Sequence, residues 1–201
     1  MRNAKPCLWI LSCLSVIGVL LFVAYDAAGQ EAGKRTRTIE IAIENLVRNG
    51  DFEVAELGWD VIYPEGGKWS YDDKVFKSGK RSLRLNPANS GSPRYFFLQQ
   101  YPPKPPAGKY IFEGWCRVSD DCNGVPVVSM NVAVPDPATP GKYANTNYSV
   151  KMPDNFPCNE WVKMSREIDI PANAVMNVQL IAPGTRGAIW FDDLFLGKTA
   201  Q

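Results

Sequence analysis

Acidic side chains stand at both ends of an otherwise apolar framework in this sequence. Asp51 and Glu53 follow the Asn-Gly break in "NLVRNGDFE", and Asp192 and Asp193 lie inside the apolar stretch "AIWFDDLFLG". A carboxylate in a strand that packs on a core costs free energy unless it is paired or bound to a metal. Adjacent strand residues point to opposite faces, so we expect one of Asp192 and Asp193 to face inward and the other to face water.

The two pairs of acids can meet if the first and last strands lie side by side. Asp51 and Glu53 are two residues apart and are expected to share one side of their own strand. Hard oxygen ligands without nitrogen or sulfur suit Ca²⁺, with backbone carbonyl groups completing its coordination. The alternative interpretation is a solvated turn at each end of the fold, and spacing alone does not decide between the two.

The composition excludes several classes of function. The chain of 201 residues contains no histidine, so Ser-His-Asp triads, histidine zinc sites and histidine acid–base chemistry are excluded. Its formal net charge is +1, without a long run of one sign, which argues against nucleic acid as a partner. Hydrophobic residues make up 45% and charged residues 21%, which is typical of a chain with a packed core.

The N-terminal residues have the pattern of a targeting segment. A basic start, an apolar run over 7–24 and a small-residue exit predict a secretory signal peptide over 1–29. Because the run is long enough to span a bilayer at the lower limit, an uncleaved anchor is the alternative. Residues 30–37 are expected to form a flexible connector. We expect the protein to be secreted and to lie outside the cell or at the cell surface, with the periplasm as the alternative. No membrane contact is expected beyond the signal segment.

Export permits disulfide bonds. Beyond the signal segment the chain keeps Cys116, Cys122 and Cys158. Cys122 in "SDDCNG" and Cys158 in "NFPCNEW" both lie in polar, turn-rich stretches, so we predict that these two pair. Cys116 falls inside a strand candidate and is expected to be a buried, small hydrophobic residue.

From residue 38 onward the apolar residues recur with a period of two, which indicates strands. The strand candidates are "TIEIAIE", "RSLRLN", "YFFLQQY", "KYIFEGWCRV", "PVVSMNVAV", "YSVKM", "WVKMSREIDI", "MNVQLIA" and "AIWFDDLFLG". Turn signals rich in glycine and proline separate them, and no stretch supports a helix of three turns. The pattern predicts an all-β domain over 38–198, a two-sheet antiparallel β-sandwich of the jelly-roll type.

Several aromatic and polar residues could bind a sugar. A sugar ring presents apolar faces and a rim of hydroxyl groups, which flat aromatic side chains and planar polar groups recognise. Trp69 and Tyr71 alternate onto one face in "KWSYDD", and strand parity points polar side chains away from the core. The candidate ligand residues are Trp69, Tyr71, Arg84, Gln99, Glu113, Arg117, Asn131, Tyr143, Tyr148 and Gln179. The alternative is core packing for the aromatic residues and a solvated sheet face for the polar ones.

Five stretches taken in order, "NLVRNGDFE", "KSGKRSLRL", "GKYIFEGWCRV", "WVKMSREIDIP" and "IWFDDLFLGK", resemble the carbohydrate-binding modules of families four, nine and twenty-two. These modules belong to the galactose-binding-domain-like superfamily, and the resemblance covers essentially the whole chain after the signal segment. It implies a jelly roll that attaches secreted enzymes to polysaccharides and carries a structural Ca²⁺. Carried over, the metal ligands are Asp51 and Lys77 through their backbone, Glu53, and one of Asp192 or Asp193.

The sequence therefore predicts non-catalytic binding of a polysaccharide or oligosaccharide by a secreted module with a structural calcium ion, accompanied by a separate secreted enzyme. An adhesive or protein-binding surface domain on the same fold is the alternative. A small jelly-roll glycosidase or lyase is less favoured, because it needs two carboxylates in one cleft and the acids here cluster at chain ends and turns. We expect no enzymatic activity.

Overall fold

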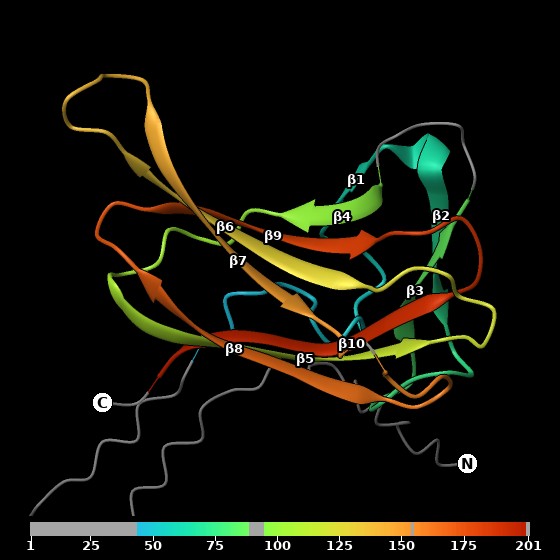
Figure 1. The fold of residues 1–201 in the computed structure, drawn as a ribbon. Coiled ribbons are helices and arrows are strands. Elements are labelled where there is room, and N and C mark those ends of the chain that lie inside the picture. Colours follow the sequence, from blue (N-terminus) through green and yellow to red (C-terminus); the bar gives the residue numbers. More distant parts are fainter. Residues whose placement is uncertain (1–43, 89–94, 154, 200–201) are drawn as a thin grey trace, which may run out of the picture. The chain divides into compact units, whose positions relative to one another are not determined.

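The computed structural model describes residues 44–88, 95–153 and 155–199, which belong to one compact unit, Ile43–Gln201 (Figure 1). The predicted signal segment, the connector and the strand expected over 38–44 lie outside these residues, apart from Glu44. The described strands are β1 (Asp60–Ile62), β2 (Gly67–Asp72), β3 (Ser82–Pro87), β4 (Phe96–Gln100), β5 (Gly108–Val118), β6 (Val127–Pro135), β7 (Tyr143–Lys151), β8 (Val162–Ile170), β9 (Val175–Ala182) and β10 (Ile189–Lys198). A short 3-10 helix, η1 (Pro64–Gly66), joins β1 to β2. No helix in the described ranges is long and apolar enough to cross a membrane.

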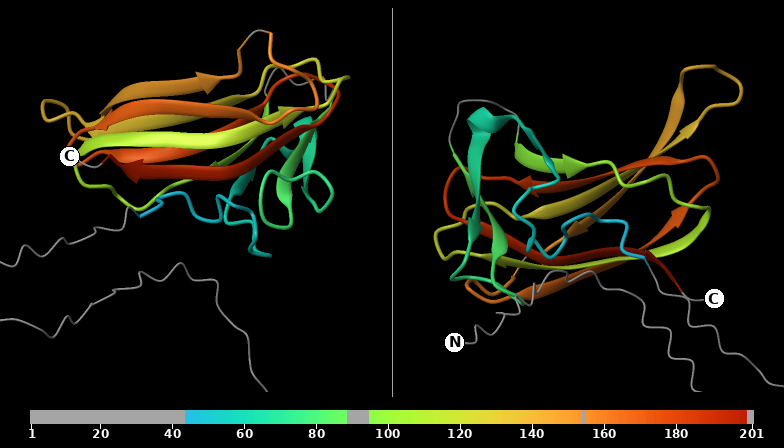
Figure 2. Two further views of the ribbon diagram at one scale, coloured as in Figure 1. Left: turned by 90° about the horizontal axis from the view of Figure 1, so that it is seen from below. Right: turned by 180° about the vertical axis from the view of Figure 1, so that it is seen from behind.

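The strands form two antiparallel sheets that face each other (Figures 1 and 2). Sheet A has the order β1-β4-β9-β6-β7, and sheet B has the order β2-β3-β10-β5-β8. The prediction of an all-β, two-sheet antiparallel sandwich is therefore confirmed. Eight of the predicted strands reappear in the structure as β3, β4, β5, β6, β7, β8, β9 and β10, and β7 begins earlier than the predicted stretch "YSVKM".

The core lies between the sheets and follows the period of two in the sequence. In β5, the alternate residues Tyr110, Phe112, Cys116 and Val118 are buried, whereas the residues between them face outward. Each large apolar side chain removed from water in this way contributes about 1.5–3 kcal/mol. On the strands, this alternation decides whether a side chain faces the core or the solvent.

The segment before β1 lies along β10 and joins the two ends of the fold. The Leu46 amide donates to the Leu196 carbonyl (2.8 Å), and the Leu194 amide donates to the Gly50 carbonyl (2.9 Å). The Asn45 side chain donates to the Leu194 carbonyl (2.9 Å) and accepts from the Leu196 amide (3.0 Å). The expected meeting of the N-terminal segment with the last strand is thus observed.

A bulge interrupts β10 where the two aspartates stand. Asp192 pairs with Trp115, but the next pair joins Phe195 to Glu113, so β10 carries one extra residue over this interval. Asp193 adopts a left-handed conformation (φ 48°) within the bulge. Such a bulge bends the strand and redirects its side chains. Asp192 is fully buried and Asp193 only partly so, but Asp192 shares the outer face of sheet B with Trp115 and does not point into the core.

The predicted disulfide bond between Cys122 and Cys158 is not formed in the structure, where both cysteines are free. Cys158 is exposed, and the half-buried Cys122 thiol donates to the Gly124 carbonyl (3.4 Å). Burial raises the pKa of Cys122, and the neighbouring thiol of Cys158 adds to the shift. Turn-rich positions indicate exposure, but a disulfide also needs specific directions of the two Cβ atoms, which a sequence does not supply. Cys116 is buried, as expected.

Gly50 provides a test of the contact between the N-terminal segment and β10. A Cβ atom at this position would collide with the Leu194 carbonyl oxygen, because the N-terminal segment approaches β10 so closely. We expect Gly50→Ala to lower the free energy of unfolding by more than about 2 kcal/mol, measured by urea denaturation. The control is Gly141→Ala, which has open space around its Cβ position and should cost only about 1 kcal/mol for its positive φ. Equal losses in the two variants would contradict the close approach.

Candidate functional site: a polar sheet face and a carboxylate clamp

The structure does not bring the ten candidate ligand residues together, because they lie on three different surfaces. Strand pairing shows which side of its sheet each residue occupies. The outer face of sheet A carries Gln99, Asn131, Tyr143 and Gln179. The outer face of sheet B carries Arg84, Glu113 and Arg117. Trp69, Tyr71 and Tyr148 lie on the core side of the edge strands β2 and β7.

The outer face of sheet A is rich in primary amides, and we call it the amide face. Its amide and serine side chains are Gln99, Gln179, Ser129, Asn131, Asn177, Asn145, Asn147 and Ser149. Gln99 on β4 pairs directly with Gln179 on β9. Both side chains are half-buried, and neither amide forms a hydrogen bond with a described residue. Each primary amide offers two donor hydrogens and an acceptor oxygen. Two such groups side by side can therefore bind vicinal hydroxyl groups of one ligand.

The asparagines of the amide face hold one another in place. The Asn147 amide donates to Ser129 Oγ (2.7 Å) and to Asn131 Oδ1. The Asn131 amide donates in turn to Asn177 Oδ1 (2.9 Å). Ser149 Oγ donates to Asn147 Oδ1 at the other end. Sequence reasoning missed Asn147 and Asn177, although Asn177 stands two residues before Gln179 and shares its parity.

Aromatic side chains flank the amide face. Phe97 on β4 lies in the row next to Gln99, and its ring meets that of Tyr63 edge to face at 5.8 Å between centroids. Tyr143, at the start of β7, is 52% exposed, and Tyr101, just after β4, is 52% exposed. Exposed aromatic rings next to planar polar groups are the combination expected of a sugar-binding surface.

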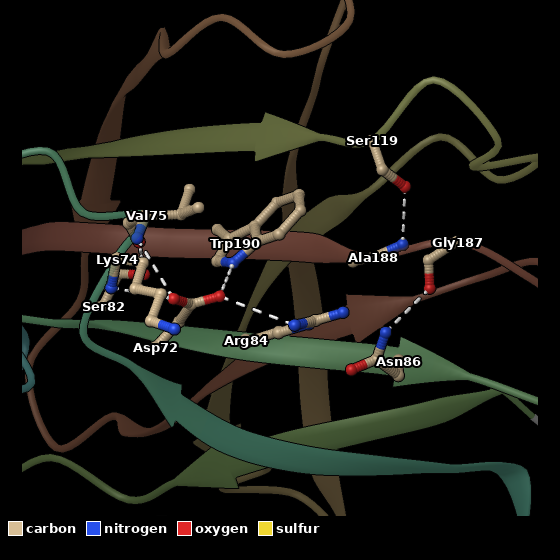
Figure 3. A network of polar contacts seen from close by, with 10 residues as sticks. All are labelled: Asp72, Lys74, Val75, Ser82, Arg84, Asn86, Ser119, Gly187, Ala188 and Trp190. Carbon is tan, nitrogen blue, oxygen red and sulfur yellow. Dashed lines mark hydrogen bonds and ion pairs between the residues drawn. The ribbon is translucent and has the colours of Figure 1, made fainter.

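The outer face of sheet B contains a polar network built around Trp190 (Figure 3). The Trp190 indole donates to Asp72 Oδ2 (2.9 Å), and Arg84 Nη1 lies 3.6 Å from the same oxygen. The Lys74 and Val75 amides donate to Asp72 Oδ1 (3.0 and 3.1 Å). Burial acts to raise the pKa of Asp72, but these hydrogen bonds and Arg84 outweigh it, so the pKa is lowered.

Farther along this face, Glu113 forms an ion pair with Lys163 (2.8 Å). Arg117 lies on the opposite side of Trp190 from Arg84, with its guanidinium carbon 5.8 Å from the indole centroid. Other residues of sheet B therefore contact all three predicted ligand residues on this face, Arg84, Glu113 and Arg117. They are separated from the amide face by both sheets.

The edge aromatics have structural partners. The Tyr71 hydroxyl donates to the Val54 carbonyl (3.0 Å), and Arg81 covers its ring at 4.1 Å. Trp69 meets Tyr71 edge to face at 5.7 Å and remains 37% exposed. The Tyr148 hydroxyl donates to the Asp169 carbonyl of β8 (3.1 Å) and links the edges of the two sheets. Of these three rings, Trp69 alone presents substantial surface to solvent.

The acids from the two ends of the chain converge on the loop 77–81, and we call Glu53, Asp192, Asp193 and this loop the clamp. Asp192 Oδ2 accepts hydrogen bonds from the amides of Lys77 (2.7 Å) and Ser78 (3.3 Å). The Ser78 hydroxyl donates to Asp193 Oδ1 (2.7 Å). The loop thus covers the bulge of β10 and buries Asp192 beneath it.

Glu53 holds the second half of the loop. Its Oε1 accepts from the amides of Lys80 (2.7 Å) and Arg81 (3.1 Å). Gly79 has a left-handed conformation (φ 65°), and a Cβ atom there would collide with the Glu53 carboxylate. Asp51 Oδ1 accepts from the Glu53 amide (3.3 Å), so these two acids lie in a turn and not on the strand that was expected there.

The clamp fits a calcium ion in the chemistry of its donors but not in the number of its acids. The donors are hard carboxylate oxygens, and Glu53, Asp192 and Asp193 form no ion pair with a described residue. However, the described residues contain no group of three or more acidic, histidine or cysteine side chains placed to hold a metal. Backbone carbonyls would therefore have to supply most of the coordination. Lys77 meets Asp192 through its amide N–H rather than its carbonyl.

Burial of Asp192 makes the stability of the clamp depend on pH. Burial is the main cause that raises the pKa of Asp192 to about 6, although the amides of Lys77, Asp193 and Ser78 act against the shift. A raised carboxyl pKa means that the folded state holds the proton more tightly than the unfolded state. The contribution of this group to stability is therefore largest at low pH and is lost as the pH rises toward and through 6.

Asp192→Asn should remove this dependence. We expect the difference in unfolding free energy between the native protein and the variant to favour the native protein more at pH 4.5 than at pH 7.5. The measurement is urea denaturation at both pH values in the presence of a chelator, which keeps metal binding out of the comparison. The same difference at both pH values would show that the Asp192 carboxyl does not titrate with a raised pKa.

Comparison with known proteins gives similarity at the level of structure only. No protein-family model matches the chain, and no curated protein matches its sequence. Among solved structures, the family 16 carbohydrate-binding module 2 aligns over 77% of this chain and 100% of its own, with 15% identity and a TM-score of 0.59. A bacteriophage CBA120 tailspike protein 4 aligns over 76% of this chain but only 21% of its own, with 14% identity and a TM-score of 0.55.

The descriptions of two further similar structures name a carbohydrate ligand. A family 61 carbohydrate-binding module in complex with β-1,4-galactotriose aligns over 78% of this chain and 99% of its own, with 16% identity and a TM-score of 0.53. A xylan-binding family 22 domain from Paenibacillus barcinonensis aligns over 79% and 98%, with 14% identity and a TM-score of 0.52. The chain therefore has the β-sandwich fold seen in carbohydrate-binding modules, as the resemblance of its motifs implied.

Proposed function

We propose that this protein binds carbohydrate without catalysis, through the amide face of sheet A. The observation that carries the proposal is the pair Gln99 and Gln179, two half-buried amides that are adjacent across β4 and β9 and unpartnered among the described residues. Because these amides form no hydrogen bond with a described residue, their donors and acceptors are available to the hydroxyl groups of a ligand. The fixed asparagine network beside the pair limits the entropy lost when the ligand binds.

The distribution of acids supports binding rather than hydrolysis. Among the strand residues that the structure describes on this face, Asp60 alone carries a carboxylate. Glycoside hydrolysis generally requires two carboxylates on either side of the scissile bond. Phe97, Tyr101 and Tyr143 supply the apolar contacts that a sugar ring needs, and the similarity in fold to modules described with galactotriose and xylan agrees with a glycan ligand.

Replacement of both glutamines tests the proposed face. We expect Gln99→Ala/Gln179→Ala to weaken glycan binding about fivefold for each hydrogen bond lost, at about 1 kcal/mol per bond. The measurement is affinity electrophoresis in gels that contain xylan, β-1,4-galactan, β-glucan or mannan, and the polymer that retards the native protein is used for the variant.

Ser165→Ala on β8, at the exposed outer face of sheet B, is the control and should leave retardation unchanged. Full retardation of the double glutamine variant would place the ligand elsewhere. Normal mobility of the native protein in every gel would reject carbohydrate binding and favour a protein-binding surface domain.

We also propose that the protein is secreted, that it accompanies a separate enzyme, and that a calcium ion reinforces the clamp. Calcium is supported by the charge of Glu53, Asp192 and Asp193, which is balanced by hydrogen bonds but not by cationic side chains. An ion there would be held by one of the two aspartates with backbone carbonyl oxygens. It would draw the loop 77–81 and β10 together and take no part in sugar chemistry.

Removal of calcium tests this part of the proposal. A metal that binds only the folded state raises the melting temperature, so a chelator should lower it, and added CaCl₂ should restore it. Differential scanning calorimetry of the native protein and of Asp193→Ala measures the effect, and the variant should show a smaller calcium-dependent shift. An unchanged melting temperature would show that the loop amides satisfy the clamp without an ion.

A further inference from the structure

The outer face of sheet B carries a row of alternating cationic and aromatic side chains. Arg84 on β3, Trp190 on β10 and Arg117 on β5 are direct partners across the three strands. The guanidinium carbons of Arg84 and Arg117 lie 5.4 and 5.8 Å from the centroid of the Trp190 ring. Trp190 is only 6% exposed, so its neighbours shield the indole while their cationic groups remain at the surface.

The charge of this row is only partly balanced. Asp72 is the one described acid that forms an ion pair with the row, at 3.6 Å from Arg84. Arg117 forms no ion pair with a described residue, and the Nε atoms of both arginines are buried without a hydrogen-bond partner. Elsewhere on the same face, Lys109 and Lys163 each contact an acid, at 3.5 and 2.8 Å. The positive charge is therefore concentrated at one end of sheet B.

The spacing of the two arginines favours a ligand with more than one acidic group. Neighbouring strands are about 4.8 Å apart, so Arg84 and Arg117 start from positions about 10 Å apart on either side of β10. Each planar guanidinium can bind a carboxylate or sulfate through two parallel hydrogen bonds.

We propose that the row of Arg84, Trp190 and Arg117 is a second binding site, which takes an acidic polysaccharide through its carboxylate or sulfate groups. The site is on the opposite side of the sandwich from the amide face and does not depend on the proposed function. The arginines bind the acidic groups, and the Trp190 indole holds the guanidinium planes in position. Binding weakens with salt, because the attraction is between charges at the surface.

The test compares three polymers with the full chain: polygalacturonate as a source of carboxylates, dextran sulfate as a source of sulfates, and neutral dextran. We expect retardation in an affinity gel by at least one acidic polymer and none by neutral dextran. Arg117→Gln should weaken binding about tenfold, and Arg84→Gln/Arg117→Gln should weaken it further. Retention of polygalacturonate alone assigns carboxylates, and retention of dextran sulfate alone assigns sulfates.

Two variants separate this site from general charge attraction and from loss of fold. Lys109→Gln removes one positive charge from the far end of the same face and should change affinity less than twofold. Arg117→Lys keeps the charge but loses the planar fork, and it should bind more weakly than the native protein with a similar dependence on salt. Melting temperatures identify any variant that is not folded.

No retardation by either acidic polymer at low salt would overturn the proposal. Equal weakening by Lys109→Gln and Arg117→Gln would also overturn it, because the attraction would then be non-specific. Gln99→Ala/Gln179→Ala should leave acidic binding intact, which distinguishes failure at this site from failure at the amide face.

Discussion

The rest of the structure depends on the contact between the N-terminal segment and β10. Gly50 approaches Leu194 so closely that there is no room for a side chain. The Asn45 side chain both donates a hydrogen bond to the backbone of β10 and accepts one from it. This contact places Glu53 beside the loop 77–81, while the bulge of β10 brings Asp192 beneath it. The loop between β2 and β3 is thus fixed from both ends of the described chain, and β3 carries Arg84, one member of the row on sheet B.

Alternation in the sequence was enough to predict the fold class and most of the strands. The short strands β1 and β2 were not predicted as such, because three residues of β1 show no clear period and β2 is an edge strand rich in polar residues. The meeting of the two acidic motifs was also anticipated, and the structure gives its geometry. The predicted disulfide bond is not formed in the structure, and spacing in a sequence does not contain the directions in space that such a bond needs.

The candidate ligand residues illustrate a second limit of sequence reasoning. Parity distinguishes the core side of a strand from its outer side, but it does not say to which sheet the strand belongs. Gln99 and Gln179 were recognised and prove to be neighbours, whereas Arg84 and Arg117 lie on the other sheet. Tyr148 was expected to bind ligand, but its parity places it on the core side of β7. There its hydroxyl donates to the Asp169 carbonyl at the edge of the other sheet.

The two outer faces consequently differ in chemistry. The amide face is uncharged over most of its width and holds its polar groups through amide–amide and amide–hydroxyl hydrogen bonds. The face of sheet B uses stacked cations, an indole and ion pairs instead. A single sandwich can present two such surfaces because its core is complete between the sheets, and neither face is needed to bury the apolar residues.

The hydrogen bonds along the amide face all run the same way. Ser149 donates to Asn147, Asn147 to Asn131, and Asn131 to Asn177, so each amide has its orientation set by the one before it. The row therefore has polarity: it ends in the free N–H groups of Asn177 beside Gln179, and it begins at a serine oxygen. A polysaccharide is also a directional chain, with a reducing and a non-reducing end. A surface that is polar along its length would distinguish the two orientations of such a chain, even where the sugar units are identical.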